Sequence, residues 1–145
     1  MTDGFAMLEH DHRAVGELFD DYEQRGDANL AKQICFELTV HGEIEEQVLY
    51  PELREFGDKT SELSDHAEEA HDKIEQTIGR IELAKPDDVF GLMETLRTMV
   101  EDHVREEEES MFPEMRDLGV DAEKLGRDLE AAKGEAVSRS RGTVG

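Results

Sequence analysis

The feature that most constrains this chain is a block of eleven residues that occurs twice. The first copy, HGEIEEQVLYP, starts at His41, and the second, HVREEEESMFP, starts 62 residues later at His103. In both copies a glutamate, Glu45 or Glu107, follows the histidine by four residues, and a proline follows it by ten. Four residues correspond to about 40° around an α-helix, so each histidine and its glutamate point the same way, one turn apart.

A second, looser match lies upstream of each block. The segment EHDHRAV, which contains His12, parallels EEAHDKI, which contains His71, at an offset of 59 residues. Each half of the chain therefore gives one histidine from its first segment and a histidine–glutamate pair from its second. Such a repeat indicates a site with pseudo-twofold symmetry, which suits two metal ions better than one.

The pattern along the chain predicts an all-α protein. It has only three prolines, and no segment alternates polar and apolar residues for long. Capping residues and breakers predict helices at 3–25, 27–56, 60–84 and 86–118. Short connections between them favour an up-down-up-down antiparallel four-helix bundle. We expect this bundle to form one domain, 1–118, followed at 119–145 by a short helix (121–133) and a flexible tail that is frayed from Ser138.

Each of the four long helices carries a histidine near the middle of its apolar stripe. One such histidine is more often a satisfied core residue than a ligand, but four at matching heights favour metal binding. A buried carboxylate costs several kcal/mol unless it is neutralised, paired or bound to a cation. Imidazole with carboxylate suits iron, manganese or zinc, whereas calcium and magnesium prefer oxygen ligands. The predicted metal ligands are His12, His41, Glu45, His71, His103 and Glu107.

Other polar residues are given lesser roles. His10 lies about 200° from His12 around the helix, so we expect it to face solvent. Tyr50 is placed for hydrogen bonding, ligation or oxidation near the metals, but the favoured interpretation is a packed ring with its hydroxyl in solvent. In the run 106–109, only Glu107 falls on the inner stripe, and the rest is interpreted as a solvated face. No nucleophile motif or phosphate-binding loop is present, so any chemistry must come from the metals.

The net charge of the chain limits the classes of partner that it can bind. Sixteen Lys and Arg against 38 Asp and Glu give a net charge of 16 − 38 = −22, which repels phosphate backbones and anionic lipid. We therefore expect neither a nucleic acid nor a membrane partner. No long apolar run and no signal peptide are visible, so the expected location is the cytoplasm. The single cysteine, Cys35, lies among apolar residues and is interpreted as a small buried hydrophobe.

Over about residues 3–118 these motifs resemble the hemerythrin-like family, also called the HHE cation-binding family. Its members carry a lone histidine on the first helix, followed by a His-x-x-x-Glu block that leads into Tyr-Pro or Phe-Pro. The resemblance implies a di-iron bundle with terminal ligands His12, His41, His71 and His103. It also implies that Glu45 and Glu107 bridge two irons that share an oxo or hydroxo group, with Mn or Zn as substitute metals.

The chain departs from the oxygen-carrying members of that family at one position. Those members have a fifth histidine four residues before the third-helix ligand, where this chain has Ala67. His66 lies one residue away, about 100° around the helix, and is an imperfect substitute. Glu9 and Glu68 each precede a ligand histidine by three residues, which is the Glu-x-x-His spacing of carboxylate di-iron bundles. They are secondary metal candidates and otherwise surface acids.

The leading functional hypothesis is a non-haem di-iron protein that binds or reacts with O2, H2O2 or NO. The missing histidine leaves a position open, which favours peroxide decomposition, as by a catalase- or peroxidase-like oxidoreductase, or redox sensing over reversible oxygen carriage. The alternatives are an iron- or oxygen-binding reservoir or sensor without turnover, and an acidic interaction module with histidines merely satisfied in the core. We expect a monomer or weak dimer, served by an unidentified redox partner.

Overall fold

The computed structural model describes residues 3–142, with side chains up to residue 139, and is helical throughout apart from short connections. No strand occurs in this range, which confirms the all-α prediction. The elements in chain order are α1 (Gly4–Arg25), α2 (Ala28–Ile44), η1 (Glu45–Leu49), α3 (Tyr50–Arg54), α4 (Asp58–Leu83), α5 (Pro86–Glu106), η2 (Glu107–Met111), α6 (Phe112–Asp117) and α7 (Ala122–Gly142), where η marks a π-helical turn.

The helices begin and end where the sequence supplies caps. The Asp3 carboxylate accepts hydrogen bonds from the backbone N–H groups of Phe5 and Ala6, and Asp27 caps α2 in the same way. Gly26 ends α1 in a left-handed conformation, with φ of 61°, that glycine adopts without steric cost. The third long helix begins at Asp58, two residues before the predicted start.

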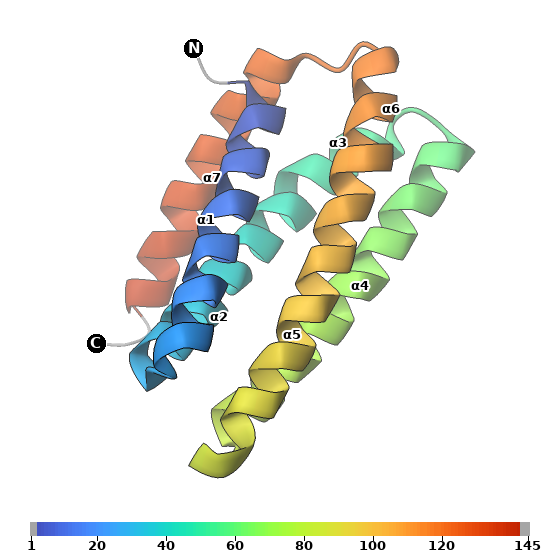
Figure 1. Cartoon of the computed structure of the whole chain (residues 1–145). Coiled ribbons are helices and arrows are strands. Elements are labelled where there is room, and N and C mark those ends of the chain that lie inside the picture. Colours follow the sequence, from blue (N-terminus) through green and yellow to red (C-terminus); the bar gives the residue numbers. More distant parts are fainter. Residues whose placement is uncertain (1–2, 143–145) are drawn as a thin grey trace.

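Successive long segments run in alternating directions, so that α1, α2–α3, α4 and α5–α6 form an antiparallel bundle (Figure 1). The helices bury two apolar clusters. One cluster includes Phe5, Leu8, Ile44 and Phe112, and the other includes Phe19, Ile34, Ile78 and Leu96. Between these clusters lies a layer of buried histidines and glutamates, which therefore sits in the middle of the bundle.

Two π-helical turns interrupt segments that the sequence predicted as continuous helices. In η1 the N–H of Tyr50 donates to the carbonyl of Glu45, and in η2 the N–H of Phe112 donates to the carbonyl of Glu107. The next residue in each case is a proline, which has no N–H and whose ring crowds the carbonyl four residues earlier. The widened turn accommodates this defect, and it starts at a predicted metal ligand both times.

The fifth helix is not short. The structure extends it to α7 (Ala122–Gly142), nine residues beyond the predicted end, and the part of the predicted frayed tail up to Gly142 is helical. Its apolar stripe of Leu125, Leu129, Ala132 and Ala136 is buried against the bundle, and α7 lies alongside α1 and α2 (Figure 1). This packing supplies the stability that its weak amphipathic pattern did not indicate. Residues 143–145 of the predicted tail lie outside the described residues.

Two further sequence-based expectations, on membrane-spanning helices and on Cys35, can be compared with the structure. Among the described residues, no helix is both long and apolar enough to cross a bilayer. Cys35 is only 7% exposed and belongs to an apolar cluster, so its interpretation as a small buried hydrophobe is confirmed.

Candidate metal centre

The six predicted ligands converge on one layer of the bundle, although they come from six elements. They form two overlapping groups in which ligand atoms lie within 4.8 Å of one another. The first group is His12, His41, Glu45 and Glu107, and the second is Glu45, His71, His103 and Glu107. Both glutamates therefore belong to both groups, and each histidine pair belongs to one.

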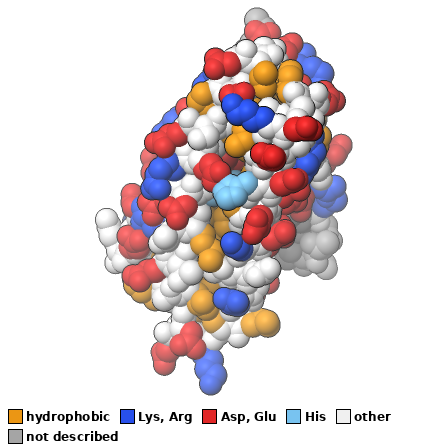
Figure 2. All heavy atoms as spheres, turned by 90° about the vertical axis from the view of Figure 1, so that its right-hand side faces the viewer, with side chains coloured by type: hydrophobic (Ala, Val, Ile, Leu, Met, Phe, Trp, Pro, Cys, Tyr) orange, Lys and Arg blue, Asp and Glu red, His pale blue; other side chains and the backbone are white. Residues whose placement is uncertain are grey.

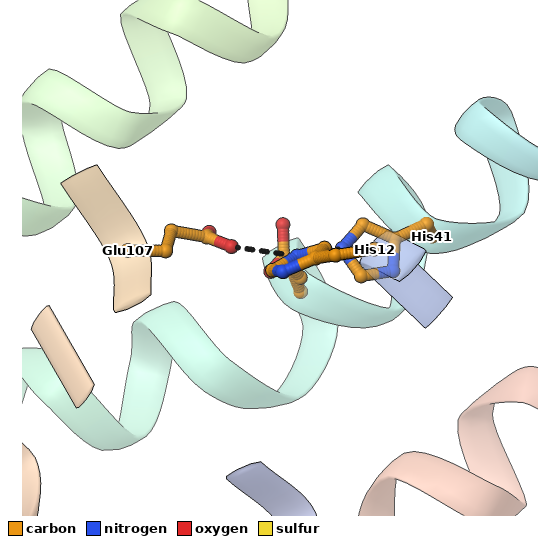
Figure 3. A group of neighbouring side chains, drawn as sticks. His12, His41 and Glu107 are labelled. Carbon is orange, nitrogen blue, oxygen red and sulfur yellow. Dashed lines mark hydrogen bonds and ion pairs between the residues drawn. The ribbon is translucent and has the colours of Figure 1, made fainter. Parts of the chain in front are cut away.

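The carboxylates span the two histidine pairs. Glu45 directs Oε2 to Nε2 of His41 at 3.2 Å and Oε1 to Nε2 of His71 at 3.0 Å. Glu107 does the same from the opposite side, because Oε1 lies 3.3 Å from Nε2 of His12 and Oε2 lies 3.1 Å from Nε2 of His103. Figure 3 shows Glu107 pointing at His12, with His41 beside it. Each glutamate thus has one oxygen for each group, which is the arrangement of a bridging carboxylate.

The imidazoles face one another through the nitrogens that metals bind. Nε2 of His12 lies 3.1 Å from Nε2 of His41, and Nε2 of His71 lies 2.9 Å from Nε2 of His103. Two nitrogens at this distance need a proton or another cation between them, since two lone pairs would repel. Oε2 of Glu45 and Oε1 of Glu107 are buried and form no hydrogen bond. Four imidazole nitrogens and four carboxylate oxygens form a donor set that would suit transition-metal ions.

Protonation would hold this centre together when no metal is bound. Burial alone would lower the pKa of His41 and of His103, but the carboxylates outweigh it, so the pKa of His41 lies well above its usual value and that of His103 is about 10. The pKa of His12 is raised by Glu107 in the same way. Burial would raise the pKa of Glu45, yet its histidine partners hold that pKa well below the usual range. A divalent metal would replace the protons that these histidines carry.

A second layer of carboxylates faces the outer nitrogens of the histidines. Nδ1 of His12 lies 2.6 Å from Oε2 of Glu108, and Nδ1 of His71 lies 3.4 Å from Oε1 of Glu46. The contact with Glu108 is a hydrogen bond of the kind that orients a metal-binding imidazole and fixes the proton on its outer nitrogen. The contact with Glu46 is a longer charge contact, because Nδ1 of His71 has no hydrogen-bond partner. Sequence reasoning missed both residues and assigned Glu108 to a solvated face. The sequence did contain a signal for a shared role, because Glu46 and Glu108 occupy the same position in the two copies of the repeated block.

Tyr50 is the largest correction to the predicted site. Its side chain is fully buried, and its hydroxyl lies among the ligand atoms of the second group instead of in solvent. It lies 2.9 Å from Oε2 of Glu107, 3.0 Å from Nε2 of His71, 3.4 Å from Nε2 of His103 and 3.3 Å from Oε1 of Glu45. Its counterpart in the repeat is Phe112, whose ring stacks on His12 and offers no oxygen. The two groups are therefore chemically different.

The secondary candidates lie away from the centre. The side chain of His66 is 62% exposed and pairs with Glu106, while Ala67 is buried in an apolar cluster. Glu9 and Glu68 belong to neither ligand group, and they pair with Arg116 and Arg54 respectively. His10 is exposed, as expected. The face of the bundle shown in Figure 2 carries many acidic side chains, with basic and hydrophobic side chains among them and a histidine.

A small cavity of about 30 Å³ adjoins the four histidines. Its remaining wall is mainly aliphatic, with Val15, Leu38, Ile74, Ile78, Val100 and Val104. One water molecule needs roughly 10–15 Å³ measured in this way, so the cavity accommodates only a very small molecule.

Comparison with known proteins agrees with the geometry. Residues 3–115 match the family model described as the hemerythrin HHE cation binding domain. A protein named "DNA nickase" from Nostoc sp. (strain PCC 7120 / SAG 25.82 / UTEX 2576) is 34% identical over 145 residues, which cover 94% of this chain and 40% of that protein. The chain thus spans less than half the length of this relative. No solved structure gives a significant match.

Proposed function

The chain belongs to the hemerythrin HHE cation-binding domain family, and from this premise we propose that it is a non-haem di-iron protein that reacts with a small diatomic ligand or with peroxide. The observation that carries the proposal is the sharing of Glu45 and Glu107 between two histidine pairs. Two carboxylates that each offer one oxygen to either pair support two neighbouring ions. Such ions, when bound, supply Lewis acidity and redox chemistry that no side chain of this site provides.

The surroundings of the centre limit what can react there. The aliphatic cavity beside the histidines has a volume of about 30 Å³, which suits O2, NO or H2O2 and excludes an organic substrate. Glu45 and Glu107 are 0% and 1% exposed, so bulk water screens their charges little and their attraction to the histidines is strong.

Within this class of ligands, we propose peroxide decomposition or redox sensing over reversible oxygen carriage. Ala67 replaces the fifth histidine of the oxygen carriers and is buried among apolar residues. The Tyr50 hydroxyl lies within 3.4 Å of four ligand atoms and adds an oxygen to the inner face of the second group. It can hold a proton beside Glu107 and His71, which is useful where a peroxide O–O bond must be protonated as it breaks.

The name of the Nostoc relative does not change this proposal. That name belongs to a protein of which the chain covers 40%. A net charge of −22 repels the phosphate backbone of DNA, so we propose no nucleic acid partner for this part of the molecule. We also propose no membrane partner, a monomer or weak dimer, a cytoplasmic location and a separate redox partner.

The test combines metal analysis with peroxide chemistry on aerobically purified protein. We expect about two irons per chain, visible absorption that changes when peroxide is added, and oxygen evolution from peroxide. Replacing one ligand in each half, by His71→Ala and separately by His12→Ala, should reduce the iron content and abolish turnover. His66→Ala is the matched control, because His66 is exposed and outside both groups, and it should keep both properties.

Two outcomes separate the alternatives. Protein that holds two irons yet neither evolves oxygen nor consumes peroxide would favour the reservoir or sensor without turnover. The metal proposal itself would be overturned if the protein stayed colourless and metal-free after anaerobic incubation with Fe²⁺ and had the same melting temperature with and without a chelator.

A further inference from the structure

We propose that Lys133 of α7 is a positioning residue for one of the two metal sites, and that it acts through Asp11 on His41. The inference rests on the proposed binding of two metals and assigns a role to the fifth helix. It concerns the group that contains His12 and His41. In the other group a carboxylate, Glu46, also faces Nδ1 of His71, but among the described contacts no lysine or arginine pairs with that carboxylate.

A continuous line of contacts leads from α7 to the ligand nitrogen. Nζ of Lys133 donates to Oδ1 of Asp11 at 3.2 Å, and the other oxygen, Oδ2, lies 3.5 Å from Nδ1 of His41. This second link is a charge contact and not a hydrogen bond, because the buried Nδ1 of His41 has no hydrogen-bond partner. Nε2 of the same imidazole faces Oε2 of Glu45 at 3.2 Å. A carboxylate beside Nδ1 favours the ring form that carries its proton there, which leaves the Nε2 lone pair for a metal.

The pseudo-twofold repeat shows that the series of contacts from Lys133 through Asp11 to His41 occurs in one half only. The offset of 59 residues that relates His12 to His71 places Ala70 opposite Asp11, so the second half lacks the carboxylate. Within residues 3–142 the second half also has no counterpart of α7, which packs against α1 and α2. The described contacts therefore give His41 a carboxylate and a cation that His103, its counterpart, does not have.

Asp11 needs a partner because it lines an open acidic cleft. The cleft, of about 400 Å³, lies between α1, α2 and α7, and Glu17, Asp21 and Glu37 also line it. Solvation of the Asp11 carboxylate by water in the cleft and its repulsion by these like charges both favour other side-chain positions for Asp11. Lys133 is the one lysine or arginine in the described lining, and it holds Oδ1 so that Oδ2 stays toward His41.

The test follows the release of iron from the loaded protein to a chelator. We expect two kinetic phases in the unaltered chain, one for each site. Lys133→Gln should accelerate one phase by roughly 10–100-fold, as loss of an outer-shell partner does, and leave the other phase unchanged. Lys133→Arg keeps the charge and should restore slow release. Arg139→Gln is the matched control, because Arg139 joins α7 to Glu43 of α2 without touching a ligand, and it should leave both phases unchanged.

A second variant separates positioning from simple undocking of α7. Asp11→Asn should accelerate the same phase as Lys133→Gln, and the double variant should be no faster than the faster single variant, because both act along one line. The metal-free forms of Lys133→Gln and Arg139→Gln should melt at similar temperatures.

Three results would overturn the inference while leaving the di-iron proposal intact. They are unchanged release from Lys133→Gln, equal acceleration of both phases, and equal acceleration by Arg139→Gln. Failure of the unaltered chain to bind iron at all would instead overturn the proposed function.

Discussion

The hydroxyl of Tyr50 lies 2.9 Å from Oε2 of Glu107, a carboxylate that also faces His12 and His103. Burial and the charges of Glu45 and Glu107 hold the pKa of Tyr50 well above its usual value, so the phenol keeps its proton in the metal-free protein and donates it to Glu107. The repeat places Phe112 at the equivalent position, and this one oxygen is the main chemical difference between the inner faces of the two sites.

Tyr50→Phe removes that oxygen and little else. We expect the variant to keep about two irons per chain, because all six carboxylate and imidazole ligands remain, but to show altered visible absorption. Its peroxide turnover should fall on the order of 10²–10⁴-fold, as when a positioned proton donor is lost. The measurements are iron content, the visible spectrum and oxygen evolution.

Tyr22→Phe provides the control for this prediction. Tyr22 is also buried, but it belongs to the apolar cluster that includes Phe19, stacks on the exposed Phe90 and is in neither ligand group. The same chemical change there should leave spectrum and turnover as they are. Unaltered spectrum and turnover in Tyr50→Phe would show that the phenol only fills space.

The repeat in the sequence was enough to find the six central residues because their positions depend on helical spacing alone. His41 and Glu45 lie on one helix face, and any antiparallel bundle that buries the apolar stripes brings the four histidines to one level. The outer carboxylates could not be found in this way. Whether Glu108 meets His12 depends on how two different helices are rotated and packed, which the pattern of one helix does not fix.

The error on Tyr50 has a local cause. In a regular α-helix a residue five positions after Glu45 points about 140° away from it, which would send the hydroxyl outward. The π turn at 45–49 takes one extra residue per turn and brings Tyr50 back over Glu45. Pro51 was the visible sign of a helix defect, but its position does not say which way the defect turns the chain. The length of α7 was missed because contacts with α1 and α2, not its own amphipathic pattern, stabilise it.

The metal-free protein should lose stability as the pH rises above neutrality. The pKa of His103 is about 10 in the folded chain and 6.5 when unfolded, so its stabilising effect is complete below pH 6.5 and disappears as the pH approaches 10. Each such histidine contributes a slope of up to about 1.4 kcal/mol per pH unit in that window. Glu45, whose pKa is lowered, stabilises above pH 4.5 and ceases to do so as the pH falls through its folded pKa.

Urea unfolding of the metal-free chain at pH 6, 7.5 and 9 measures this dependence. The free energy of unfolding should be highest near pH 6 and should decline at each step. His103→Gln should flatten the decline, whereas His66→Gln, at an exposed position, should not. A free energy that is constant or rises over this interval would contradict the raised histidine pKa values.

The thiol of Cys35 should be nearly inert in the folded protein. Burial, aided by the charge of Glu82, raises the pKa of Cys35 to about 11, so very little thiolate exists at pH 8. Relative to an ordinary thiol, the thiolate population there falls roughly a hundredfold. We expect alkylation by iodoacetamide to be slower by at least that factor than in urea-unfolded chain, as followed by mass spectrometry. Equal rates in the two states would show that the helices around Cys35 open readily.

α7 approaches α1 closely at Gly4, and this predicts opposite effects for two glycine substitutions in α1. A Cβ at Gly4 would lie 2.6–2.8 Å from side-chain atoms of Leu125, including its Cβ, which cannot move without the backbone of α7. Gly4→Ala should therefore destabilise the protein by about 1–3 kcal/mol. A Cβ at Gly16 meets nothing within 4 Å, so Gly16→Ala should stabilise α1 by about 0.5–1 kcal/mol.

Urea unfolding of Gly4→Ala and Gly16→Ala, in iron-loaded and in metal-free protein, shows directly whether each substitution lowers or raises the free energy of unfolding. Leu125→Ala removes Cγ and Cδ2, two of the three Leu125 atoms that the new methyl group would meet, and keeps Cβ. Gly4→Ala should therefore cost less in that background, and the difference measures the contact with the two removed atoms. If Gly4→Ala were neutral in both backgrounds, α7 would not be held against the start of α1 in solution. Lys133 would then lack the rigid support that its contact with Asp11 requires, because both contacts depend on the same packing of α7 along α1.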